Sequence, residues 1–243
     1  MSYEWKAALA FLATVIMVTV LGRLLVFRVP EFRLMRELND EADRVKLARK
    51  RYSDAVRANN RAALATNAAF YVAVLPFCLT LAPIPLWRQA VDALAVLLVF
   101  DFFYYLTHRF LFHGRALRKV HALHHQARTP TFADGLFVHP LETAIGLTLF
   151  LGSMPLVALV SGGPLGAFSM AAATIVFTQL NTINHCYINL PRFPFRWLSE
   201  ITWLHAAHNV DMNHGNYATL TMIYDRLFGT LEAPVFRPTP SAQ

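Results

Sequence analysis

The chain concentrates its histidines in one region, and their spacing there is typical of metal ligands. All ten histidines come after Thr107. Seven of them form three tight groups, which are His108 and His113, then His121, His124 and His125, then His205 and His208. Imidazole is the commonest metal ligand among side chains. The chain has only two cysteines, so its metal chemistry would depend on nitrogen ligands.

The first histidine group follows an acidic residue in an apolar segment. Asp101 and His108 are seven residues apart, so a helix places them on one face. An acid at this depth is usually functional and has a partner on its own face. We expect Asp101 to accept the second N–H of a ligating histidine, with Tyr105 in a similar supporting role. His113 lies about 140° round an ideal helix from His108, so both reach one site only if the helix ends or bends between them.

The second group, His121, His124 and His125, has the spacing i, i+3, i+4. On a continuous helix this spacing puts all three rings on one face. Three neutral imidazoles on one surface are suitable for binding a metal. The alternative for this group is a polar stripe that faces solvent.

Two single histidines lie beside membrane-segment ends. His139 precedes Pro140, and Glu142 follows one turn deeper; a plain helix start also explains this pattern. We treat His139 as either a metal ligand or a supporting residue. His185 and Asn184 lie at the inner end of an apolar segment, where polar residues more often line a cavity than face lipid.

The last group contains a departure from the HxxHH pattern. His205 and His208 share a helix face, and Asn209 stands where a third imidazole would complete the pattern. His214, five residues further on, lies in an Asn-His-Gly-Asn turn and could replace the missing ligand. A histidine in such a loop is as often structural as functional.

The elements that carry these groups are predicted to cross a membrane. The chain has 243 residues, is 56% hydrophobic and has a mean hydropathy of +0.38. About 18 apolar residues are enough for one crossing. The segments that qualify are Ala7–Val26, Leu64–Leu86, Ala90–Thr107, Leu141–Val160 and Leu165–Leu180. We therefore predict an all-α polytopic membrane bundle of about four or five spanning helices with a cytoplasmic, histidine-rich helical cap.

Two N-terminal features complete this organisation. No small-residue cleavage site follows the first apolar segment, so we interpret it as a retained helix and not as a signal peptide. Residues 31–61 carry dense mixed charge with spaced apolar positions, which predicts an amphipathic cytoplasmic helix at the membrane surface. Cys78 lies within an apolar segment, which argues against a disulfide framework.

The net charge of +7 indicates orientation and not nucleic-acid binding. Ten Lys and Arg lie between Arg28 and Arg61, five between His108 and His139, and four after Asn189. The opposite side of a five-span chain holds only Lys6 and Arg88. The positive-inside rule then puts the N-terminus outside, and the C-terminus and all histidine groups on the cytoplasmic side. The basic residues there suit anionic lipid headgroups.

Taken in order, the motifs resemble those of the fatty acid hydroxylase / sterol desaturase superfamily, which are integral-membrane, non-haem di-iron enzymes. The motifs are HRFLFH, HALHH, HPLE, NHCYINLP, HAAHN, GNYA and YDRLFGT. The resemblance covers about residues 90–232. It implies a catalytic domain at 90–232, N-terminal membrane helices and a linker helix at 1–89, and a flexible tail at 233–243.

The resemblance also implies roles for individual residues. The metal ligands would be His108, His113, His121, His124, His125, His185, His205 and His208, and the position of His139 at a helix start adds it as a further candidate. The supporting residues around them would be Asp101, Tyr105, Glu142, Asn184, Asn209 and His214. The family has histidine where this chain has Asn209, so the last ligand position differs.

The implied activity is O₂-dependent hydroxylation or desaturation of a lipid, such as a fatty acyl chain, a sterol or another isoprenoid. Two iron ions would be the cofactors, although zinc could occupy the same sites in a purified sample. Electrons would come from a partner, such as a ferredoxin or a cytochrome b5-like protein with its reductase, because no flavin, haem or iron–sulfur motif is visible. The alternative is a non-catalytic or degenerate metal-binding relative. A transporter would carry its ionisable residues nearer the bilayer midplane.

Overall fold

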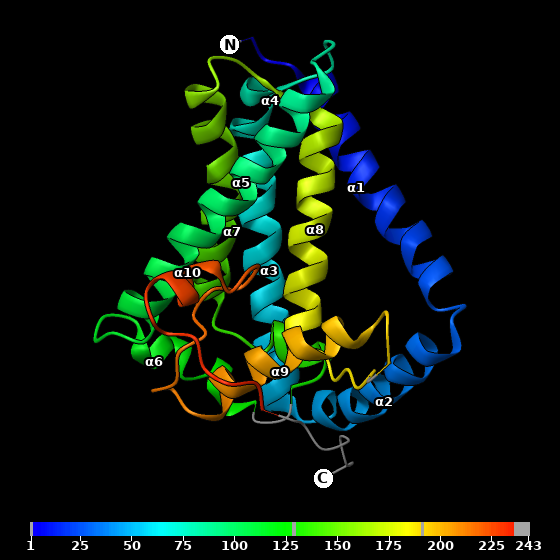
Figure 1. Cartoon of the computed structure of the whole chain (residues 1–243), viewed down its shortest axis with the longest axis vertical. Coiled ribbons are helices and arrows are strands. Elements are labelled where there is room, and N and C mark those ends of the chain that lie inside the picture. Colours follow the sequence, from blue (N-terminus) through cyan, green and yellow to red (C-terminus); the bar gives the residue numbers. More distant parts are fainter. Residues whose placement is uncertain (1, 128–129, 191, 236–243) are drawn as a thin grey trace.

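The computed structural model describes residues 2–127, 130–190 and 192–235, and it is a bundle of long helices (Figure 1). Five helices form the bundle: α1 (Trp5–Val26), α3 (Lys50–Ala73), α5 (Leu86–Thr107), α7 (Pro140–Val160) and α8 (Ala167–His185). The shorter helices α2 (Pro30–Leu47), α6 (Arg118–His121) and α9 (Arg196–Val210) gather at the end opposite the N-terminus, which we name the histidine end. Helix α10 (Ile223–Leu227) packs beside α5, nearer the middle of the bundle.

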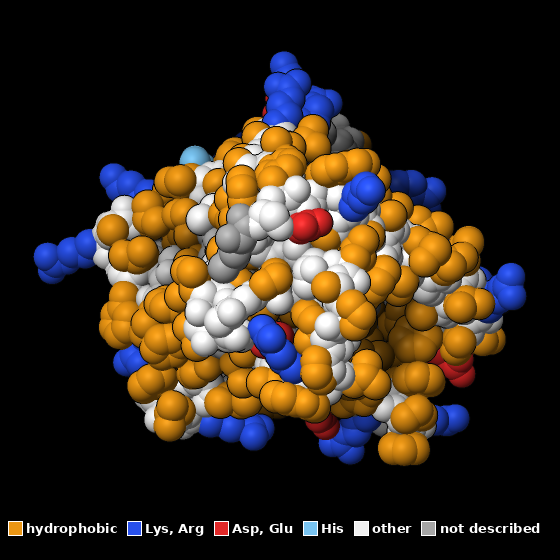
Figure 2. All heavy atoms as spheres, turned by 90° about the horizontal axis from the view of Figure 1, so that it is seen from above, with side chains coloured by type: hydrophobic (Ala, Val, Ile, Leu, Met, Phe, Trp, Pro, Cys, Tyr) orange, Lys and Arg blue, Asp and Glu red, His pale blue; other side chains and the backbone are white. Residues whose placement is uncertain are grey.

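Three helices among the described residues are long and apolar enough to cross a membrane. They are α1, α5 together with the turn that continues it to Phe112, and α7. Most of α1 is unburied, and Leu24 and Leu25 are each 61% exposed, which water would disfavour and lipid would not. Seen from the N-terminal end, hydrophobic side chains cover much of the surface and most Lys and Arg project at its rim (Figure 2). The predicted all-α membrane bundle is confirmed.

The predicted span at Leu64–Leu86 is not one helix. Helix α3 ends at Ala73, and the chain continues as a single turn, α4 (Leu75–Cys78), and then β1 (Leu79–Thr80). Pro76 has no N–H to donate and its ring cannot follow a helical turn, so the helix breaks before it. Strand β1 pairs in parallel with β2 (Leu165–Gly166). Strand β1 follows α4 and β2 precedes α8, so the pairing links these two helices at the N-terminal end of the bundle.

The predicted amphipathic helix at 31–61 is divided in two. Only its first part, α2, lies across the histidine end, whereas residues from Lys50 onward belong to α3 and enter the bundle (Figure 1). Helix α2 is fixed by buried polar contacts. Asn39 exchanges two hydrogen bonds of 2.9 Å with the backbone of Tyr187, and Asp43 accepts from Ala133 and Thr131.

Aromatic side chains fill the core where α5, α7 and α8 meet. Phe150 and Phe177 stack with their ring centroids 4.0 Å apart, and Phe100 packs edge-on against Phe177 at 4.9 Å. Helix α8 carries Gln179 and Asn181 in its lower half. It is not one of the three described helices that are long and apolar enough to cross a membrane. These polar residues lie toward the histidine end, below the aromatic layer.

Candidate metal centre

A π-helical turn brings the first two histidines to one place. The turn η1 (His108–Phe112) continues α5, and the N–H of His113 donates to the carbonyl of His108 over 2.9 Å. The wider turn rotates His113 back toward the face of His108, and their ring centroids lie 5.0 Å apart. This is the bend that the five-residue spacing required, and single π turns often occur at functional sites.

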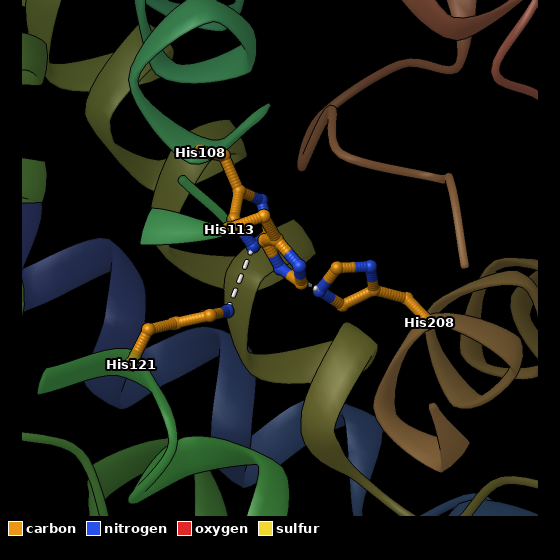
Figure 3. Close-up of side chains that lie close together, drawn as sticks. All are labelled: His108, His113, His121 and His208. Atoms are coloured by element: carbon orange, nitrogen blue, oxygen red, sulfur yellow. Dashed lines mark hydrogen bonds between the residues drawn. The ribbon is translucent and has the colours of Figure 1, made fainter. Parts of the chain in front are cut away.

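Four histidines from three segments converge at the end of this turn. His108, His113, His121 and His208 offer ligand atoms that lie within 4.8 Å of one another, and we name them the four-histidine group (Figure 3). The Nε2 atoms of His108 and His121 are 3.0 Å apart, and those of His113 and His208 are 3.2 Å apart.

A second cluster lies next to the first. His124, His185 and His205 form the three-histidine group, with neighbouring Nε2 atoms 3.3 Å and 3.1 Å apart. His205 and His208 on α9 contribute to different groups, and their ring centroids are 5.8 Å apart. The two groups are therefore neighbours, at a spacing that allows two ions side by side.

The second sequence group does not form the single helical face that we predicted. Helix α6 ends at His121, and a 3₁₀ turn, η2 (His124–Gln126), follows. His121 belongs to the four-histidine group and His124 to the three-histidine group. The Nε2 of His125 lies 3.0 Å from that of His121, so this ring is adjacent to the four-histidine group. The break between the two turns distributes the rings over both groups.

Hydrogen bonds at Nδ1 fix the orientation of these rings. His108, His113 and His208 direct Nδ1 to the carbonyls of Tyr217, Met212 and Gly215 over 2.6 to 2.7 Å. Carbonyls only accept, so each Nδ1 carries the proton. In a neutral ring Nε2 then carries a lone pair. Lone pairs that face each other across about 3 Å repel unless a cation lies between them.

The same pattern extends to two further rings. The Nδ1 of His121 lies 2.9 Å from Oε1 of Glu142, and that of His185 lies 2.7 Å from the carbonyl of Asn181. A carboxylate behind a histidine raises its basicity as a ligand and fixes its tautomer. The supporting role predicted for Glu142 therefore has a direct contact in the structure.

Burial favours the neutral form of the four rings His121, His124, His125 and His208. It lowers the pKa of His121, His124 and His208 well below the usual range, and neighbouring histidines lower it further. Burial also lowers the pKa of His125 to about 4, with His113 as the next cause. Neutral imidazole is the form that binds a metal.

Asp101 acts on a loop and not directly on a histidine. Its two oxygens accept from the N–H groups of Thr219, Leu220 and Thr221 over 3.0 to 3.1 Å, and from the Thr221 hydroxyl. We expected Asp101 to accept from a ligating histidine, but its hydrogen bonds in the described part of the chain go to residues 219–221, and the Nδ1 of His108 contacts the carbonyl of Tyr217 instead. Asp101 instead holds the segment that carries the Tyr217 carbonyl.

The YDRLFGT motif also holds the loop that carries the Tyr217 carbonyl. Asp225 on α10 accepts from the N–H groups of Tyr217 and Ala218 at 2.8 Å and from the Thr230 hydroxyl. The loop passes so close that a Cβ on Gly215 would lie 1.8 Å from the carbonyl oxygen of Thr230. The sequence did not reveal the carbonyls at 212, 215 and 217 as partners of the histidines. The GNYA motif contains two of these positions, 215 and 217, and the YDRLFGT motif contains Asp225 and Thr230.

The remaining predicted residues lie around the groups without joining them. His139 is exposed and its Nδ1 accepts from the N–H of Leu141, so it caps α7 and lies outside both groups. His214 contacts the carbonyl of Ala207, and Asn184 donates to the carbonyl of Thr219. Tyr105 is bonded to Arg109 and Thr230.

Asn209 is buried in α9 beside His208. It is 1% exposed, and neither its amide oxygen nor its amide nitrogen has a hydrogen-bond partner among the described residues. An unsatisfied buried amide is costly, so this side chain is a candidate for a missing contact. It occupies the position at which HxxHH would have its third imidazole.

A cavity of about 280 Å³ leads from the histidines into the bundle. Its walls come from α3, α5, α7 and α8, and its lining includes His108, His124, His185 and His205. A helical membrane bundle with clustered neutral imidazoles around such a cavity defines an integral-membrane metal-binding protein.

The comparisons with known proteins identify the family. Residues 93–230, more than half of the chain, match the sequence model of the fatty acid hydroxylase family. The chain therefore belongs to this family, and the resemblance inferred from its motifs is confirmed. The comparison with solved structures finds no match.

Three curated relatives illustrate the range of this family. Protein CER1-like 2 of Arabidopsis thaliana is 31% identical over 159 residues, which are 61% of this chain and 25% of that protein. Methylsterol monooxygenase 1 of Rattus norvegicus is 31% identical over 54% of this chain and 43% of its own length. Ornithine lipid hydroxylase OlsE of Rhizobium tropici is 30% identical over 64% and 45%. The alignments thus span less than half of each relative.

Proposed function

We propose that the protein is a membrane-bound di-iron oxygenase that uses O₂ and external electrons to hydroxylate or desaturate a lipid. The observation that carries this proposal is the set of inward-facing Nε2 atoms in rings whose Nδ1 atoms are bound to acceptors. Such an arrangement is stable only around cations. The relatives named as lipid and sterol oxygenases support the reaction class.

The histidines present fit metal ions in distance and chemistry. Two nitrogens that bind one ion at about 2.1 Å lie about 3.0 to 3.4 Å apart, and the neighbouring Nε2 atoms here are 3.0 to 3.3 Å apart. We assign one ion to the four-histidine group with His125, and one to the three-histidine group. An all-imidazole set suits redox iron, and zinc can occupy it in a purified sample.

The chain's own residues position the lipid and control protons. When bound, the iron would supply the reducing power that activates O₂ toward an unactivated C–H bond. Glu142 holds His121 in the tautomer that presents Nε2 to the centre, and the backbone carbonyls do the same for His108 and His208. The cavity walls hold the lipid beside the histidines and exclude water, which limits side reactions.

Orientation and electron supply belong to the same proposal. The basic residues predict that the histidine end faces the cytoplasm and the N-terminus lies outside. An electron donor, such as a ferredoxin or a cytochrome b5-like protein with its reductase, would dock on that end. The lipid would come from the bilayer itself.

One observation favours an alternative. Asn209 stands at the last ligand position, and its amide has no hydrogen-bond partner among the described residues. The same substitution would be expected in a non-catalytic relative that binds metal but does not oxidise a lipid. Lipid analysis separates the two functions. The deletion strain should lack one lipid that differs from its precursor by one oxygen or by two hydrogens. Complementation with the wild-type gene should restore that lipid, and complementation with His124→Ala should not. Identical lipids in all three strains would contradict the enzyme proposal.

A further inference from the structure

The cavity wall carries polar side chains above the histidines, at the depth of the membrane-spanning helices. Asn59, Ala63 and Asn67 recur every four residues on one face of α3, and all three line the cavity. Tyr104 and Asn181 line it from α5 and α8. An asparagine in an apolar bundle is costly unless it faces a cavity or a partner.

Several polar atoms of this wall have no partner in the described part of the chain. The Oδ1 of Asn59 accepts from Thr143, while its Nδ2 makes no hydrogen bond there. Asn67 donates to the carbonyl of Ala63 and its Oδ1 makes no such bond. The Tyr104 hydroxyl and the Asn181 amide make no hydrogen bond to the described residues either, and neither side chain is fully buried, so they face the cavity.

The shape of the cavity limits what part of a ligand these atoms can meet. Leu136, which is 42% exposed, and the exposed Thr182 line the cavity where it is near the surface, while the buried Phe100 and Phe177 line it at the aromatic layer. Phe177 lies eight residues above His185 on α8, or about 12 Å along the helix axis. A bound segment of about that length touches the three-histidine group at one end and passes the polar wall.

We propose that this cavity selects a lipid that carries a hydrogen-bonding group, a hydroxyl or an amide, on the segment that enters the bundle. Asn59, Asn67, Tyr104 and Asn181 are the candidate partners of this group, at different depths of the cavity, because Asn59 and Asn67 lie about 12 Å apart along α3. The proposal rests on the oxygenase function and makes it narrower. An unsubstituted hydrocarbon segment would leave these atoms unsatisfied, and sites built to hydrogen-bond a ligand reject the analogue that lacks the group.

The test compares two photoreactive probes in vesicles that contain the full-length, metal-loaded protein. Both probes are C16 hydrocarbon chains with a diazirine close to one end, and the second probe carries a primary hydroxyl on that same end. Labelling of α3 and α8 is quantified by mass spectrometry. We expect the hydroxyl probe to label cavity residues at least tenfold more than the hydrocarbon.

Matched variants test whether the polar residues of the cavity wall cause the preference for the hydroxyl probe. At least one of Asn67→Leu and Asn181→Leu should reduce the preference to below threefold. Asn60→Leu makes the same change on the exposed face of α3 and should leave it unchanged. If the wild type labels equally with both probes, or if folded Asn67→Leu and folded Asn181→Leu both behave like Asn60→Leu, the proposal is wrong. The wild-type comparison decides even if a variant fails to fold.

The failure of this proposal can be told apart from the failure of the proposed function. A protein that keeps the probe preference but makes no oxidised lipid contradicts the oxygenase proposal alone. A protein that oxidises lipids and shows no preference contradicts only the selection of a polar group.

Discussion

The most informative single change is Asp101→Asn, because Asp101 holds the loop that orients the histidines and, among the described residues, makes no hydrogen bond to a histidine itself. The carboxylate accepts four hydrogen bonds from residues 219–221. Bonds to a charged group contribute about 1.5 to 3 kcal/mol each. Asparagine removes the charge, keeps one accepting oxygen and turns an N–H toward the donors of Thr221.

We therefore expect a loss of about 1.5 to 6 kcal/mol in stability, from the one or two bonds that cannot re-form. The loop also carries the Tyr217 carbonyl that binds His108. Loss of such a supporting contact lowers metal affinity by about 10- to 100-fold. Competition with a chelator of known affinity measures this change in the purified protein.

The matched control is Asp92→Asn on the same helix. Asp92 is also buried, but it accepts from Ser161 near the N-terminal end, away from the histidines. This variant should lose stability and retain metal affinity. Equal metal affinity in Asp101→Asn and wild type would refute the role of the loop, and so would an equal loss in both variants.

Three further changes probe other parts of the centre. Gly215→Ala puts a Cβ 1.8 Å from the Thr230 carbonyl and should displace the carbonyl that binds His208, lowering metal content by about one ion; Gly152→Ala, with open space around it, should not. The metal-free protein should lose thermal stability as the pH falls from about 6.5 toward 4. In this range the His125 ring binds a proton in the unfolded chain but stays neutral in the folded protein, where its pKa is lowered to about 4. A melting temperature independent of pH would contradict this. Asn209→His should increase the metal retained against a chelator, because it adds an imidazole where the amide has no partner among the described residues, and decreased retention in a folded variant would show that Asn209 is needed as it is.

The sequence predicted the participants better than their arrangement. Seven of the nine predicted ligands converge in two groups because histidine spacing and motif order carry that information. The division of His121 and His124 between groups depends on a helix break that the spacing alone does not reveal. The bend between His108 and His113 was required by geometry, and the structure supplies it as a π turn.

The loop contacts were beyond prediction for a physical reason. Asp101 and the segment 219–221 lie more than a hundred residues apart, and backbone N–H groups leave no pattern in a sequence. An acid on the same helix face as His108 therefore favoured a direct contact, although tertiary structure provided a different partner. Likewise, the apolar run across Pro76 resembled a span because hydropathy does not register a missing N–H.

We propose that seven or eight histidines hold two metal ions in adjacent groups. The direct measurement is iron per chain, by mass spectrometry of protein purified from iron-supplemented cells, for wild type, His208→Ala and His205→Ala. We predict two ions in the wild type and about one in each variant, because the two substitutions open different groups. Two ions retained in either variant, or fewer than one in the wild type, would contradict the claim.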